Sequence, residues 1–144
     1  MRYKLIDESH GWRTFMVVFD KGDAAMKKLL EFVTAQEITA ASFVGLGAFS
    51  EARLAFYDRT TKEYTPIPVD EQTEVLNITG NVALYNGEPR LHAHAMLSRP
   101  DSSTIGGHLV EGIVWPTLEI TLVASPDQLE RDLDEETGLP LLRP

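Results

Sequence analysis

From Ile38 onward the sequence is a succession of short apolar runs separated by turn residues, and this pattern limits the fold more than any other feature. Asn86-Gly87 lies between two of the runs and is typical of a tight hairpin, because both residues tolerate positive φ. Strands joined by short turns are antiparallel neighbours, so the pattern predicts a mostly antiparallel sheet. The runs fall at about 40–48, 52–58, 62–69, 73–85, 89–98 and 112–124.

One further strand and one helix are predicted before these runs. Residues 12–19 are rich in β-branched and aromatic side chains, which favour a strand. Apolar residues then recur at helical spacing from Met26 to Val33, with Asp23 as the expected N-cap. A sheet packed against one main helix is an α+β fold, which we expect to form a single domain over residues 1–144. The tail from 127 to 144 is expected to lie across that domain.

Charge and cysteine content exclude several classes of function. The chain has 13 Lys and Arg against 22 Asp and Glu, a net charge of −9, and its basic residues are not clustered. DNA binding by the chain alone is therefore not expected. Cysteine is absent, which excludes disulfides and thiolate metal sites. With neither a signal-like segment nor a long apolar run in the sequence, we expect a cytoplasmic protein without membrane contact.

Three of the four histidines are close together in the sequence and form the best candidate site. His92 and His94 are two residues apart in a strand and so project from one face. A turn near Asp101 would bring His108 roughly opposite His94. Three neutral imidazoles with one position left for water are typical of catalytic zinc, although manganese, iron or nickel also fit. We therefore expect a divalent metal here, with zinc as the first choice.

The same residues also have a simpler interpretation. Two histidines at positions i and i+2 of a strand are often just half-exposed side chains that bind no metal. Likewise, two glycines before a histidine, as in Gly106-Gly107-His108, often form only a bulge. The alternative is that the glycines permit a close approach of the backbone or a positive φ. The fourth histidine, His10, is expected in a surface loop.

Two glutamates are candidates for acid–base chemistry. Glu119 alternates with apolar neighbours in a strand-like run, and Glu111 follows His108 by three residues. Each is a solvent-facing acid on one interpretation. On the other, either residue borders the histidines and moves a proton during catalysis.

Six segments follow one another along nearly the whole chain: Phe19-Asp20-Lys21-Gly22-Asp23, Gly45-Leu46-Gly47-Ala48-Phe49-Ser50, Asn77-Ile78-Thr79-Gly80-Asn81, His92-Ala93-His94, Gly106-Gly107-His108-Leu109 and Thr117-Leu118-Glu119-Ile120. In this order they resemble the plants-and-prokaryotes-conserved (PPC or PCC) domain family. The resemblance implies an α+β domain that assembles as a homotrimer, a metal at the three histidines, and a fold-level likeness to acetolactate decarboxylase. Neither Arg99-Pro100 nor Arg143-Pro144 has the flanking Arg-Gly of the AT-hook found in plant members, so the chain looks like the stand-alone bacterial and archaeal type.

Two functions remain open from the sequence. The first is a trimeric binding or regulatory module with a three-histidine metal site and a protein or small-molecule partner. The second is a zinc-dependent lyase or hydrolase acting on a small oxyacid or ester, with Glu119 or Glu111 moving the proton. An enzyme requires the histidines in a pocket with an open coordination position. We favour the module, because no acid–base pair with a diagnostic spacing is present.

Overall fold

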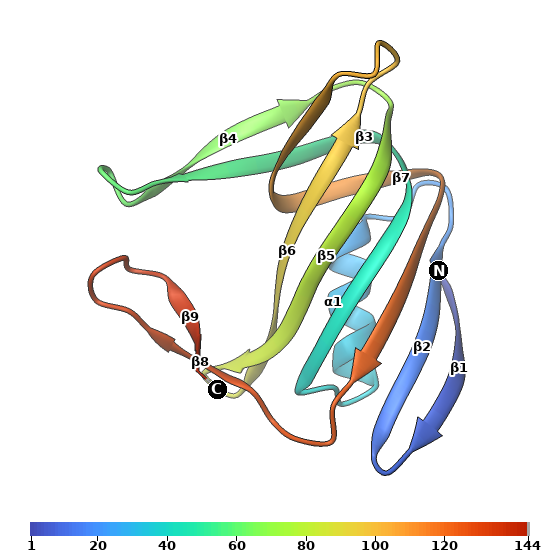
Figure 1. The fold of residues 1–144 in the computed structure, drawn as a ribbon, viewed down its shortest axis with the longest axis vertical. Helices are drawn as coiled ribbons and strands as arrows, with labels where there is room; N and C mark the ends of the chain where they lie inside the picture. Colours follow the sequence, from blue (N-terminus) through green and yellow to red (C-terminus); the bar gives the residue numbers. More distant parts are fainter. Residues whose placement is uncertain (144) are drawn as a thin grey trace.

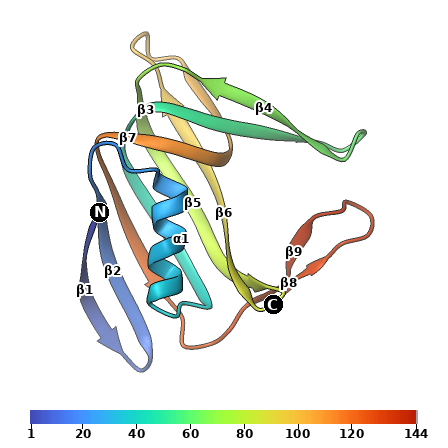
Figure 2. The same cartoon turned by 180° about the vertical axis from the view of Figure 1, so that it is seen from behind.

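The computed structural model describes residues 1–143 and contains one sheet with a helix on one of its faces. The helix lies behind the sheet in Figure 1 and in front of it in Figure 2. This confirms the predicted fold class, a mostly antiparallel sheet packed against one main helix. The elements are β1 (Arg2–Ser9), β2 (Trp12–Phe19), α1 (Ala25–Ala35), β3 (Ala40–Asp58), β4 (Glu63–Val69), β5 (Thr73–Tyr85), β6 (Glu88–Ser98), β7 (Thr104–Ala124), β8 (Glu130–Leu133) and β9 (Pro140–Arg143).

The two longest strands, β3 and β7, organise the sheet. They pair antiparallel along both of their halves, with register shifts between Gly47 and Phe49 and again beyond Phe49. The second half of β7 also pairs with β2, and its first half pairs with β6. Strand β5 pairs with the first half of β3 on one side and with β6 on the other. Because β6 also pairs with β7, the sheet curls back on itself.

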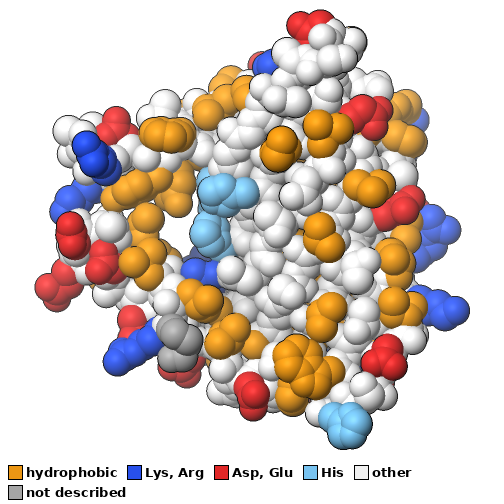
Figure 3. All heavy atoms as spheres, in the orientation of Figure 1, with side chains coloured by type: hydrophobic (Ala, Val, Ile, Leu, Met, Phe, Trp, Pro, Cys, Tyr) orange, Lys and Arg blue, Asp and Glu red, His pale blue; other side chains and the backbone are white. Residues whose placement is uncertain are grey.

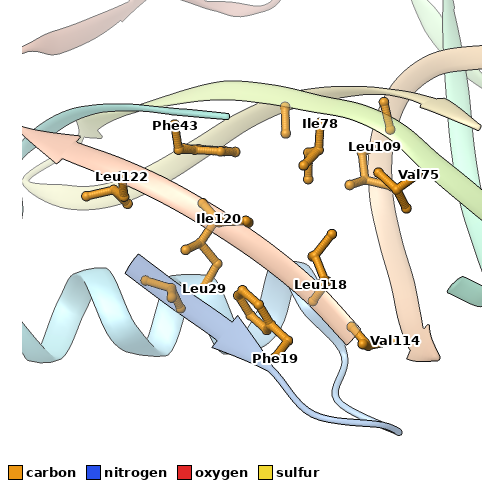
Figure 4. Close-up of a cluster of buried hydrophobic side chains, with 14 of the residues drawn as sticks. Phe19, Leu29, Phe43, Val75, Ile78, Leu109, Val114, Leu118, Ile120 and Leu122 are labelled. Carbon is orange, nitrogen blue, oxygen red and sulfur yellow. The ribbon is translucent and has the colours of Figure 1, made fainter. Parts of the chain in front are cut away.

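Helix α1 buries its apolar side against the inner face of the sheet. Figure 4 shows Leu29 of the helix beside Phe19 and Ile120 of the strands, and all three are almost completely buried. Burial of one such side chain stabilises a fold by about 1.5–3 kcal/mol. Side chains alternate along β6: Ala93 and Ala95 face this core, and His94 between them faces outward.

The start of α1 differs from the prediction. Asp23 is not its N-cap; the cap position is Ala24, without a side-chain bond, and the Asp23 carboxylate pairs with the N-terminal ammonium at 2.9 Å. Glu111 of β7 takes over this role from a remote strand. Its carboxylate accepts hydrogen bonds from the backbone N–H groups of Met26 and Lys27 at 2.7 and 3.2 Å. These are donors that the first turn of a helix cannot satisfy by itself.

The observed strands differ from the predicted ones in three respects. The runs at 40–48 and 52–58 are one continuous strand, β3, because bulges rather than a turn separate them. Strand β7 begins at Thr104 rather than near residue 112. Strand β1 was not predicted, because it is exposed along its whole length and has no alternation of buried residues.

The tail forms the hairpin of β8 and β9, which protrudes beside β5 (Figure 1). It joins the sheet through Leu84 and Glu130, the one parallel pairing found among residues 1–143. The Tyr57 hydroxyl of β3 also donates to the carbonyl of Thr137 at 2.6 Å. Within the same residues, no helix has the length and apolar character to span a membrane.

Candidate metal centre

Strands β6 and β7 bring the three histidines together. His94 and His108 are direct partners in the antiparallel register, as predicted, and His92 lies on the same outer face two residues earlier. The turn between the strands closes with the N–H of Arg99 donating to the Ser103 carbonyl at 2.9 Å. The site is therefore built by one hairpin and its register.

The two glycines before His108 permit a close approach of the strands. A Cβ atom added at Gly107 would lie 2.9 Å from the Ala55 carbonyl oxygen of β3, and one at Gly106 would lie 3.0 Å from that of Ala95 in β6. Neither glycine has a positive φ. Close approach, rather than an unusual backbone angle, thus explains this pair, and it lets β7 fit between β3 and β6.

The side chains converge to the spacing of a metal site. One ring nitrogen from each of His92, His94 and His108 can be chosen so that all three lie within 4.8 Å of one another. The ring centroids are 5.2–5.6 Å apart. A tetrahedral zinc with ligands at about 2.0–2.1 Å holds its nitrogens about 3.4 Å apart.

Burial keeps two of the imidazoles in the neutral form that binds metals. The pKa of His108 is lowered to about 4, first by its burial and then by His92 and His94. The pKa of His92 is also lowered, by burial, by the nearby charge of Arg131 and by His94. The Nδ1 atom of His108 is buried and has no hydrogen-bond partner. A buried nitrogen without a partner is costly unless something binds it, so this donor set fits a metal ion.

Two of the three histidines, His92 and His108, border a hollow of about 310 Å³, here called the histidine hollow. Figure 3 shows the pale-blue side chains at the inner edge of a gap between two protruding parts of the molecule, which in Figure 1 are the β3–β4 end and the β8–β9 hairpin. Its walls are largely apolar and aromatic, with one buried arginine. The lining residues are Tyr64, Tyr85, Arg90, Leu91, His92, His108, Arg131, Leu139, Pro140 and Leu141.

Two lining residues of this hollow were not found from the sequence. Tyr64 of β4 places its ring 5.0 Å from that of His108, at 37°, and so holds the imidazole from the side opposite β6. Arg131 of β8 is only 8% exposed. Its guanidinium donates to the Pro140 carbonyl at 3.2 Å and makes a short hydrogen bond to the Asn81 side-chain oxygen. Nothing in the irregular sequence of the tail indicated that Arg131 would be buried.

The structure does not bring the two candidate glutamates to the histidines. Glu111 caps α1 on the opposite face of the sheet, where it lines a separate hollow of about 320 Å³ with Glu51, Arg53 and Asp70, here called the helix-cap hollow. Glu119 is on the outer face but pairs with Leu46 of β3, so β3 and β5 lie between it and β6. Neither glutamate lines the histidine hollow.

His10 lies in the exposed turn between β1 and β2, with φ 53°, as expected of a surface residue. It takes no part in the cluster formed by the other three histidines.

Comparison with known proteins identifies related structures. Residues 6–126 match the model of the Plants and Prokaryotes Conserved (PCC) domain. A Bacteroides thetaiotaomicron protein, provisionally described as DNA-binding, has 27% identity and a TM-score of 0.90, with 98% of this chain and 96% of that chain covered. A Pyrococcus horikoshii plant- and prokaryote-conserved protein has 29% identity and a TM-score of 0.86, covering 99% and 95%.

Two further comparisons concern metal and fold. An Archaeoglobus fulgidus protein described as metal-containing has 29% identity and a TM-score of 0.85, with 100% of this chain and 99% of that chain covered. A Staphylococcus aureus protein of unknown function, described as similar to α-acetolactate decarboxylase, has 10% identity and a TM-score of 0.55, covering 74% and 50%. This confirms the expected likeness at the level of the fold alone. No curated protein matches the sequence.

Proposed function

The chain belongs to the PCC domain family, and on that premise we propose that it is a binding or regulatory module that holds one divalent metal at His92, His94 and His108. The observation that carries the proposal is the convergence of three imidazole nitrogens within 4.8 Å. The unpartnered Nδ1 of His108 supports it, and so does the metal-containing relative from A. fulgidus. Zinc is the proposed ion, because a set of three imidazole ligands suits it.

A homotrimer is part of the proposal. Four large apolar side chains, Val44, Leu46, Leu76 and Met96, are more than half exposed on adjacent strands of the outer sheet face. Figure 3 shows orange side chains spread over this face. Val44, Leu46 and Leu76 line one shallow hollow, and large apolar side chains gathered in this way on a surface are typical of subunit contacts. The sequence places Phe43, Phe56 and Trp115 in strands, where their exposure in a single chain would favour assembly. Phe56 and Trp115 are exposed, whereas Phe43 is buried in the core and gives no such support.

A DNA-binding role is not included, although the B. thetaiotaomicron relative is provisionally described in that way. The net charge of −9 repels the phosphate backbone, and the sequence has no basic cluster. The lack of cysteine fits a reducing cytoplasm, where we propose that the protein works.

The second candidate function is a zinc-dependent lyase or hydrolase for a small oxyacid or ester. It is favoured by one observation, namely that His92 and His108 border a hollow of about 310 Å³. A bound zinc ion would supply Lewis acidity there. None of the described residues that line the hollow is Asp or Glu, and the Glu111 carboxylate is engaged at the helix. A carboxylate that could act as general base is thus missing from the described walls, and we rank the binding module first.

The test is zinc titration of metal-free protein that has no affinity tag, followed by calorimetry, with the mass measured by light scattering. We expect one zinc per chain and an assembly of three chains of 16.1 kDa each. A stoichiometry well below one per chain contradicts the metal site. A mass of one chain at micromolar concentration contradicts the trimer, and does so independently.

A further inference from the structure

We infer that Arg131 makes the histidine hollow a site for a small carboxylic acid with a second oxygen donor. The carboxylate would meet the guanidinium, and the second oxygen, a hydroxyl or carbonyl, would meet the metal at the histidines. The inference rests on the proposed metal site and extends it by naming the class of ligand.

Arg131 is a buried cation whose bonds are to neutral groups. It is only 8% exposed, and its partners are a carbonyl oxygen and an amide oxygen, those of Pro140 and Asn81. No carboxylate pairs with it among residues 1–143, although the chain has nine more acidic than basic residues. A guanidinium has five N–H donors, so about three remain for a ligand. A buried charge without a counterion is costly, and an anion at this position offsets that cost.

The walls of the hollow define the remainder of the ligand. Leu91, Leu139 and Leu141 contribute apolar surface, and Tyr85 contributes a ring. One buried guanidinium matches one carboxylate, because the planar fork of arginine donates two parallel hydrogen bonds to two oxygens. A single anionic end and an apolar body therefore fit better than a phosphate dianion, which needs more donors.

The metal side of the hollow accounts for the second oxygen. His92 and His108 border the same space as Arg131. Three protein ligands leave a tetrahedral zinc one further position, normally taken by an oxygen. A 2-hydroxy or 2-keto acid presents its two oxygen groups on adjacent carbons, which allows one small molecule to meet both.

This part of the site comes from outside the matched family domain. The match ends at residue 126, whereas Arg131 and residues 139–141 lie in the β8–β9 hairpin. The hairpin is tied to β5 by the N–H of Leu84, which donates to the Leu129 carbonyl at 2.8 Å. The choice of ligand is thus a property of the tail, which lies beyond the residues that match the family model.

The first experiment uses the unaltered protein loaded with zinc. Calorimetry compares 2-hydroxy-3-methylbutanoate with its uncharged amide and with inorganic phosphate. We expect the acid to bind at least about tenfold more tightly than the amide, since one charge-assisted pair contributes about that much. Equal affinity for acid and amide, or tighter binding of phosphate, overturns the inference. In cobalt-loaded protein the acid should also change the visible spectrum of the metal, and an unchanged spectrum at saturation rejects direct contact.

The second experiment assigns the effect to one arginine. Arg131→Gln should weaken binding of the acid at least about tenfold and leave the zinc content at one per chain. Arg53→Gln, which changes an exposed arginine at the helix-cap hollow, is the matched control and should change acid binding little. If Arg131→Gln retains zinc and still binds the acid as tightly as the unaltered protein, the role of Arg131 is rejected but the metal site is not. Failure of the unaltered protein to bind zinc rejects both.

Discussion

The histidine hollow and the helix-cap hollow are of almost equal size, about 310 and 320 Å³, but their polar groups are used differently. In the helix-cap hollow, Glu111 accepts hydrogen bonds from three backbone N–H groups, those of Met26, Lys27 and Gly112. In the histidine hollow, the Nδ1 of His108 has no partner, and Arg131 has neutral ones. Volume alone does not distinguish a ligand site from a structural feature. A ligand site is instead distinguished by polar groups for which the fold itself supplies no partner.

The largest expected effect is on metal content in the histidine hollow. The double change His92→Ala with His94→Ala removes two of three ligands, so zinc should fall from one per chain to less than about a tenth. Elemental analysis after dialysis measures this. His10→Asn is the control, because His10 is exposed at a positive φ that asparagine also adopts, and it should retain full zinc.

The same double variant tests whether the site is open in type. Its metal-free form should remain folded, because both changed side chains lie on the outer face of β6, away from the core. Circular dichroism and thermal melting check this. Stoichiometric zinc in the double variant would place the ion elsewhere in the molecule.

The next effect is on stability, and it belongs to the helix-cap hollow. Glu111→Ala leaves the N–H groups of Met26 and Lys27 without their acceptor, and should lower the free energy of unfolding by about 1–2 kcal/mol, as loss of a cap does. Urea unfolding measures it. Glu119→Ala, an exposed position on the same strand, should change it by less than about 0.5 kcal/mol. Zinc content should be normal in both, and a loss of zinc in Glu111→Ala would erase the contrast between the two hollows.

A further effect on stability, absent at neutral pH, is expected when metal-free protein is acidified. The folded pKa of His108 is about 4, below the ordinary value of 6.5, so between these values the unfolded chain takes up a proton that the folded chain does not. Stability should therefore fall as pH drops from 6.5 toward 4. His108→Gln removes this contribution and should flatten the fall, as measured by urea midpoints at several pH values in the presence of a chelator. Identical pH profiles would show that burial of His108 has little energetic effect.

The smallest expected effect is on DNA. Arg90 and Arg131 at the histidine hollow, and Arg53 at the helix-cap hollow, are too few to outweigh a net charge of −9. We expect no change in the fluorescence anisotropy of a labelled duplex at physiological salt with micromolar protein. Sub-micromolar binding that weakens steeply with salt would mean that assembly gathers basic residues into one surface.

Local pattern was sufficient for much of the fold. The run at 73–85 coincides with β5, and Asn86-Gly87 forms the predicted turn, with φ 54° and 80°. What failed depended on distant contacts. The helix is capped by Glu111, which accepts a hydrogen bond from the N–H of Met26, 85 residues away in the sequence, and Asp23 pairs with the N-terminus instead. No local propensity contains that information.

The candidate site divides in the same way. His92, His94 and His108 follow from the period of a strand and one turn, both of which are local. Arg131 depends on how the tail folds back on β5, through the single pairing of Leu84 with Glu130. That placement is set by tertiary contacts, and the sequence has no periodic signal for it.

The pairing of His94 with His108 makes metal binding a check on how the chain has been assembled. Successive residues of a strand point to opposite faces, so a slip of one residue between β6 and β7 would separate the ligands or turn one of them inward. A hairpin in the shifted register cannot bind the ion, whereas the hairpin in the native register is stabilised by the free energy of metal binding. If zinc binds at the three histidines as proposed, it would therefore add to the stability of the correct alignment of these two strands, although the metal-free chain can still fold.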